Sequence, residues 1–326
     1  MRIKFIRKIK QRINDIKNVC SVAGLPYIYE MVIIPHWGKK KNKLARCWRK
    51  HEAIISFLEK EYATLIKKYS LSVQSVSHPI IAKKEAPIWV CWWQGESQMP
   101  PIVRSCYQSL LENAGEHPVH LITEESIDQY IQIPTYILQK VKKGNISFTH
   151  FSDIIRMALL YEHGGLWLDA TIYVSRPLKD KIFDSPLFSV APNIDTELVS
   201  QAKWSGFLLG GYPQEPLFGF VRDFFFEYWK KENRLIDYFL IDYAIYIIRQ
   251  NSPYINVLLE SIPKHYKIFD MEQNLDKPYD KEYFTQLCHQ QTFHKLNYKI
   301  KYTTYTADHK QTIYGYLIKG IKQYIK

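Results

Sequence analysis

The chain has 326 residues, of which 46% are hydrophobic and 15% aromatic, and it carries a formal net charge of +12. This composition excludes a disordered or collagen-like chain and predicts a folded protein with a sizeable core. The charge favours anionic partners such as nucleoside diphosphates, nucleic acid or an acidic membrane surface. Five scattered cysteines fit neither a disulfide framework nor a metal site, so we expect a reducing compartment.

Residues 1–84 are predicted to form a basic helical region. Ile6, Ile9 and Ile13 recur at helical spacing among lysines and arginines, and a second helix is expected over residues 43–69. A solvated helix face and a contact with anionic lipid both explain these charges. No stretch approaches the roughly 20 apolar residues that span a bilayer, and the N-terminus does not have the pattern of a signal peptide.

These features predict a cytoplasmic protein, with peripheral attachment to the inner face of the cell membrane as a hypothesis. The basic, aromatic segment 314–326 is open to the same hypothesis. Packing of Leu317 and Ile321 into the core explains that segment equally well.

Residues 85–326 show alternating strand and helix patterns. Strands are expected at residues 88–93, 119–122, 166–168, 187–191 and 206–211. Helices are expected from Pro100 to Asn113, after Thr123, before Gly164-Gly165 with Thr149 or Ser152 as the cap, and over residues 217–231 and 235–249. This alternation predicts an α/β fold with a mostly parallel sheet, in which ligands bind beyond the carboxyl ends of the strands.

Three charged residues are the candidates for chemistry. Asp153 and Arg156 are three residues apart on a predicted helix, and Asp169 follows the strand that comes after Gly164-Gly165. An acid and a guanidinium on one helix face can hold a sugar ring and a diphosphate. Asp169 offers a hard oxygen ligand for Mg²⁺ or Mn²⁺. On spacing alone, a surface ion pair and a turn-forming aspartate are the more common explanations.

Taken together, Ser152-Asp153-Ile154-Ile155-Arg156 and the run from Gly164-Gly165 to Asp169-Ala170-Thr171 resemble the signature of DXD-containing sugar transferases. These include α-mannosyltransferases of the yeast initiation type and the glucosylating clostridial toxins. The strand reading W-L-D-A-T resembles the capsular polysaccharide synthesis branch. The resemblance covers residues 87–211, and it implies a GT-A glycosyltransferase domain over residues 85–326 with a Rossmann-like, mostly parallel sheet, an N-terminal helical extension and a C-terminal amphipathic segment.

The resemblance also implies roles for individual residues. Trp93 would stack on the nucleotide base with Gln94 beside it, although Trp93 also fits a core position. Asp153 and Arg156 would contact the donor sugar and diphosphate, and Asp169 matches the first acid of the DXD motif. The donor would be a UDP-sugar, and the acceptor a growing glycan or a lipid-linked saccharide.

Thr171 departs from the family pattern, because it stands where the second acid, commonly the metal ligand, would be. Two alternatives follow. Either Asp169, the substrate phosphates and water hold Mn²⁺ or Mg²⁺, or basic groups replace the metal ion. His294 and Lys295 are candidates for that replacement, as are Lys299 and Lys301, which also fit a surface charge cluster.

The wider family transfers sugars with retention of anomeric configuration, so the resemblance implies front-face displacement. Asp242, inside an aromatic and aliphatic helix, is a candidate acceptor-side base or a buried, satisfied acid. A degenerate GT-A domain acting as a scaffold in polysaccharide assembly is the alternative function, and the missing second acid favours it. Nucleic-acid binding is disfavoured, because the basic residues are dispersed and no recognition motif is present.

Overall fold

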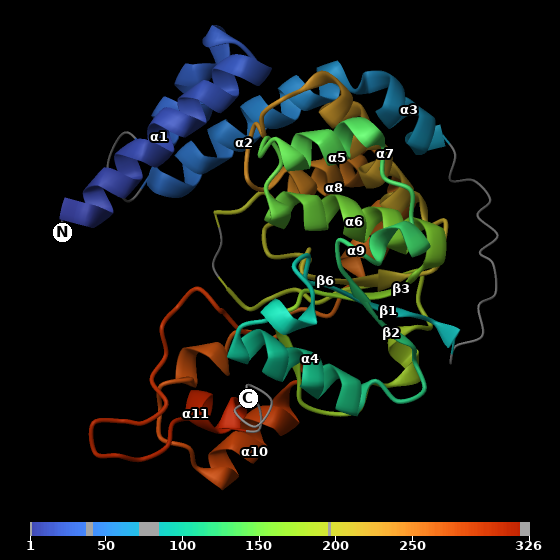
Figure 1. Cartoon of the computed structure of the whole chain (residues 1–326). Coiled ribbons are helices and arrows are strands. Elements are labelled where there is room, and N and C mark those ends of the chain that lie inside the picture. Colours follow the sequence, from blue (N-terminus) through green and yellow to red (C-terminus); the bar gives the residue numbers. More distant parts are fainter. Residues whose placement is uncertain (1, 37–41, 72–84, 195–196, 320–326) are drawn as a thin grey trace.

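The computed structural model describes residues 2–36, 42–71, 85–194 and 197–319 (Figure 1). Its helices are α1 (Arg2–Val22), α2 (Lys43–Glu61), α3 (Ala63–Leu71), α4 (Pro101–Asn113), α5 (Thr135–Lys142), α6 (Phe148–His163), α7 (Pro216–Lys231), α8 (Leu240–Asn251), α9 (Pro253–Glu260), α10 (Lys281–Gln290) and α11 (Ile313–Leu317). Short helical turns occupy residues 25–36. Within the described residues, no helix is long and apolar enough to cross a bilayer.

The central sheet has the strand order β2-β1-β3-β6-β5. Its strands are β1 (Ile88–Cys91), β2 (Val119–Ile122), β3 (Gly165–Leu168), β5 (Leu187–Phe188) and β6 (Leu208–Gly211). β2, β1 and β3 are parallel, whereas β6 is antiparallel to both β3 and β5. All strands of this sheet except β6 therefore run in one direction, which confirms the predicted mostly parallel sheet. A second, two-stranded sheet pairs β4 (Ile172–Val174) with β7 (Phe293–Lys295).

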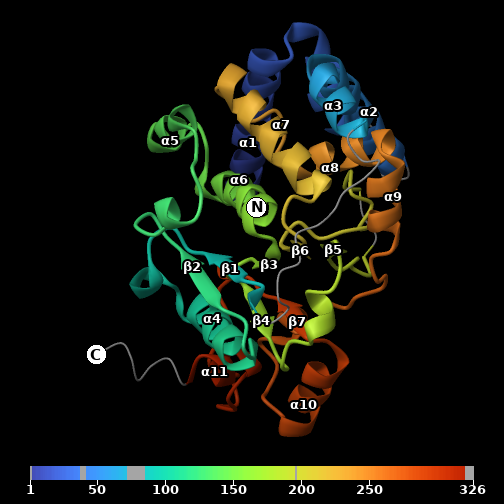
Figure 2. The same ribbon diagram turned by 90° about the vertical axis from the view of Figure 1, so that its right-hand side faces the viewer.

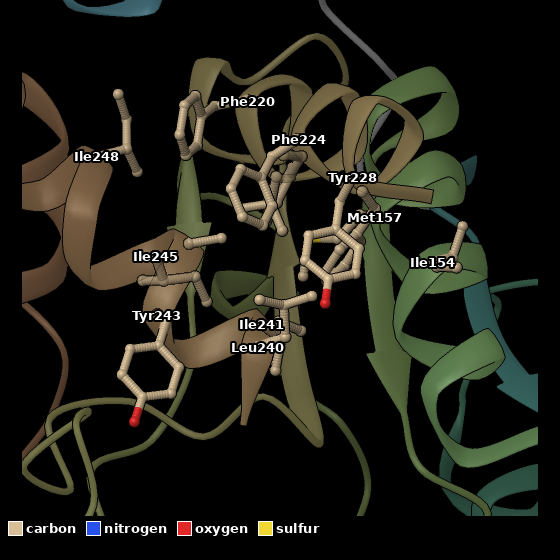
Figure 3. Close-up of a cluster of buried hydrophobic side chains, with 14 of the residues drawn as sticks. Ile154, Met157, Phe220, Phe224, Tyr228, Leu240, Ile241, Tyr243, Ile245 and Ile248 are labelled. Carbon is tan, nitrogen blue, oxygen red and sulfur yellow. The ribbon is translucent and has the colours of Figure 1, made fainter. Parts of the chain in front are cut away.

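Helices cover both faces of the central sheet (Figure 2). Trp89 and Trp167 point from the strands into one core with α6, α7 and α8, while Val90 and Leu168 point into a second core with α4 and α11. Alternate residues of a strand face opposite sides of a sheet, so strands buried on both faces become continuously apolar. Figure 3 shows the first core, in which Phe224 and Tyr228 of α7 lie among aliphatic side chains of α6 and α8.

The described part of the N-terminal region packs on this first core. The predicted apolar stripe of α2 and α3 is buried, including Ile54, Leu58 and Leu65. Tyr62 lies 4.7 Å from Phe224, measured between ring centroids. By contrast, residues 8–14 of α1 are exposed at the periphery. Lys39, Lys40 and Lys41 lie outside the described residues.

Two glycines join α6 directly to β3. Gly164 and Gly165 have φ values of +64° and +88°, and a Cβ at Gly165 would lie 2.1 Å from the carbonyl oxygen of Pro87. Only glycine tolerates both this backbone conformation and this close approach. The predicted helix stop is therefore confirmed, and Asp169 follows β3 within a few residues of the turn.

Two predicted helix starts were wrong. Ser147, not Thr149 or Ser152, caps α6, and its hydroxyl accepts the backbone N–H of His150. α8 begins at Leu240 rather than at residue 235. Tyr228 and Asp237 side chains accept the N–H groups of Ile236 and Phe239, so these groups already have partners before the helix begins.

Four other elements are shorter than predicted: β1 ends at Cys91 instead of residue 93, β6 begins at Leu208 instead of residue 206, and the remaining two differences have local causes. After Thr123 the chain forms a turn, in which the Thr123 hydroxyl accepts hydrogen bonds from the backbone N–H groups of Glu125 and Ser126. Only a short 3-10 helix (Ile127–Gln129) follows. β5 ends at Phe188, because Ala191 bonds to the loop containing Pro263 and Tyr266 instead of extending the strand.

Candidate active site

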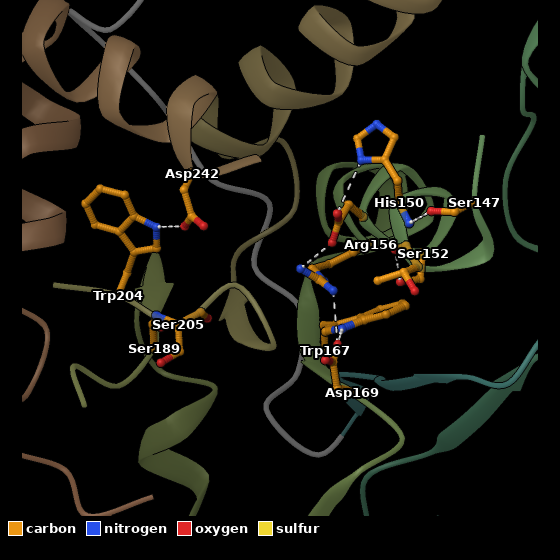
Figure 4. Close-up of polar contacts among 12 residues, drawn as sticks. Ser147, His150, Ser152, Arg156, Trp167, Asp169, Ser189, Trp204, Ser205 and Asp242 are labelled. Carbon is orange, nitrogen blue, oxygen red and sulfur yellow. Dashed lines mark hydrogen bonds and ion pairs between the residues drawn. The ribbon is translucent and has the colours of Figure 1, made fainter. Parts of the chain in front are cut away.

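Arg156 bridges the two predicted acids. From α6, its Nη1 lies 3.1 Å from Oδ1 of Asp153, and its Nη2 donates to Oδ1 of Asp169 at 3.0 Å (Figure 4). The indole N–H of Trp167 donates to the same oxygen of Asp169 at 3.0 Å, and its ring lies 5.0 Å from the guanidinium carbon. The helix and the strand end therefore converge, as the sequence predicted.

Lys295 closes the cluster from the second sheet. Its ammonium donates to Oδ2 of Asp169 and to the hydroxyl of Thr171, each at 2.8 Å. Pairing of β7 with β4 fixes this position, because Lys295 stands opposite Ile172, next to Thr171. The ring of Phe207 packs 4.9 Å below the ammonium.

The cluster is electrically balanced and partly open. Asp153 and Asp169 face Arg156 and Lys295, two acids against two bases. Burial favours the protonated form of Asp169, but the Lys295 ammonium and the Arg156 guanidinium outweigh it and hold the pKa of that carboxyl below its ordinary value. The side chains of Asp169 and Lys295 are 28% and 19% exposed, against 4% for Arg156. The accessible surface of the cluster is thus formed by acids and an ammonium over a buried guanidinium.

His150 orients Asp153 from the next turn of α6. The indole N–H of Trp229 donates to Nε2 of His150 at 2.9 Å, and an indole can only donate. In the neutral ring, Nδ1 therefore carries the proton and lies 3.4 Å from Oδ2 of Asp153. A pocket of about 350 Å³ lies on this side of the site, lined by His150 and by Asn14 and Asn18 of α1.

Aromatic and polar side chains also lie at the carboxyl edge of the sheet. Trp93 follows β1 and contacts Phe151 of α6 edge-on at 5.0 Å, so it is partly buried against the start of this helix. The adjacent Gln94 is exposed. Tyr238 is 65% exposed.

The chain also matches known proteins. Residues 36–317 match the family model described as "Capsular polysaccharide synthesis protein". The chain belongs to this family. It is similar to the O-glycosyltransferase braB of Annulohypoxylon truncatum, with 26% identity over 112 residues. The matched region covers 32% of this chain and 26% of the length of that relative. The solved structure of the PaToxG glycosyltransferase has a TM-score of 0.36 and 12% identity, covering 65% of this chain and 91% of the other.

For this member of the capsular polysaccharide synthesis family, Asp153, Arg156, Asp169 and Lys295 come together as one constellation. His294 does not join it, because neighbouring residues of β7 point in opposite directions. Its Nε2 lies 3.1 Å from the hydroxyl of Ser175, and burial lowers its pKa to about 4. Lys299 and Lys301 are exposed.

Asp242 lies near the constellation without touching it. It is buried on α8 and accepts the indole N–H of Trp204 at 2.7 Å. Burial raises the pKa of Asp242 to about 7. Gly206 lies beside Arg156 and beside Ile241, the residue before Asp242, since a Cβ there would lie 3.3 Å from Nη1 of Arg156 and 3.8 Å from Ile241.

The donor set does not fit a divalent cation. Mg²⁺ and Mn²⁺ prefer several carboxylate or other hard oxygen ligands with free lone pairs. Both oxygens of Asp169 already accept hydrogen bonds from cations, and the Thr171 hydroxyl accepts one from Lys295. Within the described residues, no group of three or more His, Cys, Asp or Glu side chains could hold a metal ion.

His150 and Trp167 are site residues that sequence reasoning missed. Both signals were present, because His150 precedes Asp153 by three residues on the same helix and Trp167, near the end of β3, precedes Asp169 by two residues. Each spacing places the pair on one side of its element, as the contacts bear out.

Proposed function

We propose that this protein is a glycosyltransferase that moves a sugar from a nucleoside diphosphate donor, a UDP-sugar, onto a glycan or lipid-linked saccharide in capsular or surface polysaccharide synthesis. The observation that carries this proposal is the guanidinium of Arg156 held between Asp153 and Asp169 at the carboxyl edge of the sheet. Ligands of α/β sheets bind at this edge. Membership of the capsular polysaccharide synthesis family supports the same function.

Different residues of the site bind different parts of the donor. The partly exposed carboxylates of Asp153 and Asp169 accept hydrogen bonds from sugar hydroxyls, and the buried guanidinium of Arg156 holds both carboxylates in place. Lys295 supplies positive charge toward the diphosphate. Trp93 and Gln94 at the end of β1 offer an aromatic face and an amide to the nucleotide base.

Transfer then proceeds with retention, by front-face displacement. The bond between the anomeric carbon and the leaving phosphate oxygen breaks, while a bond to the acceptor oxygen forms on the same face. The acceptor proton passes to the leaving phosphate, or to Asp242 when its carboxylate is ionised. A double displacement would need a free carboxylate beneath the anomeric carbon, whereas Asp153 and Asp169 are both engaged in ion pairs.

Of the two acceptor classes we propose the lipid-linked one, to which α1 brings the protein at the inner face of the membrane. Its exposed side carries an isoleucine stripe with three- and four-residue spacing (Ile6, Ile9, Ile13 and Ile16). Lys10, Arg12 and Lys17 flank the stripe and are exposed. A second copy would bring these like charges together, whereas anionic headgroups complement them. Asn14 and Asn18, on another face of the same helix, line the pocket beside His150, so α1 lies between the proposed membrane surface and that pocket.

The C-terminal segment contributes less to this attachment. Leu317 is buried in the core formed with α4, which favours the packing alternative for that residue. Ile321 lies outside the described residues.

Donor hydrolysis tests the proposed function. The purified full chain, incubated without acceptor and with UDP-glucose, UDP-galactose, UDP-N-acetylglucosamine or GDP-mannose, is expected to release nucleoside diphosphate slowly from one donor, because water substitutes for the acceptor. The measurement is release of the diphosphate in the presence and absence of Mn²⁺. A folded chain that neither binds nor hydrolyses any donor would support the scaffold alternative instead.

A further inference from the structure

The turn from Asp169 to Thr171, which corresponds to the DXD motif, already holds a cation, namely the ammonium of a lysine side chain of this protein. The ammonium of Lys295 lies 2.8 Å from Asp169 and 2.8 Å from Thr171, the two residues that correspond to the first and second acids of the motif. It therefore contacts both motif positions at once. Phe207 fixes it from the opposite side, and backbone pairing of β7 fixes it along the strand.

Charge balance favours a single positive charge at this point. An acid at position 171 would give the turn two carboxylates, which suits a divalent ion. Thr171 leaves one, and Arg156 and Lys295 already neutralise Asp153 and Asp169. A divalent ion would enter a neutral cluster within a few ångströms of a fixed ammonium, and like charges at such distances repel strongly where water is partly excluded.

We propose that Lys295 takes the place of the divalent cation, so that this protein binds its diphosphate donor and transfers the sugar without Mg²⁺ or Mn²⁺. This inference rests on the proposed function. An ammonium has three N–H groups, and Asp169 and Thr171 accept two of them. The third is available to a phosphate oxygen, where the positive charge stabilises the diphosphate as it leaves.

The opposing explanation is that Lys295 only pairs with Asp169 until a donor arrives with its metal ion, which then displaces it. The two explanations differ in what EDTA does to the untreated, full-length protein. If Lys295 is the resident cation, UDP binding measured calorimetrically changes by less than about threefold between EDTA and Mn²⁺, because affinity does not depend on the ion. The electron paramagnetic resonance spectrum of Mn²⁺ then shows no protein-bound ion beyond the Mn²⁺–UDP complex.

A pair of variants assigns the effect to one ammonium. Lys295→Met keeps the length of the side chain and is expected to weaken UDP binding in EDTA at least about tenfold, because a charge pair with phosphate is lost. Lys281→Met removes an exposed lysine from α10 and is expected to leave binding unchanged. Thermal melts of both variants identify any loss of folding, and the wild-type comparison decides the question without either variant.

Three results would overturn the inference. UDP binding by the wild type that requires Mn²⁺, with a protein-bound Mn²⁺ spectrum, would leave the proposed function intact and assign the cation role to the metal. A folded Lys295→Met variant that binds UDP as tightly as the wild type in EDTA would remove the role of Lys295. UDP binding in neither condition would reject the proposed function and this inference with it.

Discussion

At the scale of single residues, the carboxylates of this protein differ in environment in a way that separates their roles. Asp169 is surrounded by cations and has a lowered pKa, so it stays ionised, whereas burial raises the pKa of Asp242 to about 7. A carboxyl that titrates near neutral pH is suited to accept a proton. The structure therefore provides fixed negative charge in the constellation and, in Asp242, an acid that titrates near neutral pH, which suits the proposed role of acceptor-side base.

The raised pKa of Asp242 predicts a pH-dependent stability. The folded protein binds the proton more tightly than the unfolded chain, where the ordinary value is 3.8. The stabilising contribution is thus complete below that value and is lost as pH rises through about 7. Asp242→Asn keeps an oxygen acceptor for Trp204, so its melting temperature is expected to rise relative to wild type as pH increases from about 5 to about 8.

Exposed Asp128→Asn controls for the loss of one negative charge, and it should shift the melting temperature by the same amount at every pH. If Asp242→Asn behaves like Asp128→Asn across this range, Asp242 does not titrate as described. Turnover measured on the same samples reports on its proposed role, because an acceptor-side base would make the rate of wild type rise through about pH 7.

Sequence reasoning predicted the centre of this site but not all its contacts. Asp153, Arg156 and Asp169 followed from helix spacing and a recognisable motif. Sequence reasoning did not predict that Lys295 joins the site while His294 faces away from it. That difference depends on how β7 pairs with β4, and such register comes from long-range pairing. The roles of these two residues, and that of Trp93, stay predictions.

At the scale of elements, α6 and β3 were predictable because local chemistry sets their boundaries. Gly164 and Gly165 end the helix and allow the close approach to Pro87. The start of α8 was not predictable, because side chains of Tyr228 and Asp237 bind the preceding backbone N–H groups. The Tyr228 hydroxyl reaches Ile236 only when the chain turns back on α7, whereas Asp237 bonds locally to the backbone two residues on.

The isoleucine stripe of α1 predicts binding to anionic membranes. In flotation assays, the full chain is expected to bind vesicles containing phosphatidylglycerol, to bind phosphatidylcholine vesicles weakly, and to dissociate as salt rises, because headgroup attraction is screened. Replacing Ile9 and Ile13 together by Gln is expected to weaken binding at least about tenfold, since each buried isoleucine contributes on the order of 2 kcal/mol.

Leu111→Gln is the matched control, because Leu111 is a similarly exposed apolar residue on α4, which lies on the other side of the sheet (Figure 2). Vesicle binding by the Ile9 and Ile13 variant equal to that of Leu111→Gln would reject the membrane role of the stripe. Concentration-dependent dimerisation that the same variant abolishes would instead assign the stripe to self-association.

At the scale of the whole molecule, the sheet assembles a site from segments that are distant in the sequence. The ends of β1 and β3 meet at one edge, and β7 returns near the end of the described chain to place Lys295 against Asp169. The division of the chain after residue 84 stays a prediction, although α2 and α3 share a core with α7 and α8. Sequence periodicity located these helices, but only packing reveals which core they enter.

The central claim is that Arg156 holds the two acids of a donor site in place. The measurement is calorimetric titration of the Arg156→Lys and Arg222→Lys variants with the nucleotide sugar that the wild type is found to hydrolyse. Thermal melts confirm that both variants fold. Arg222 also pairs with an acid, Asp223, and stacks on Tyr161, so it controls for loss of a packed guanidinium. The single ammonium of a lysine does not reproduce the planar fork whose two nitrogens each meet one carboxylate, so we predict donor affinity at least about tenfold lower for Arg156→Lys and unchanged for Arg222→Lys. Equal affinity of the two variants would contradict this account.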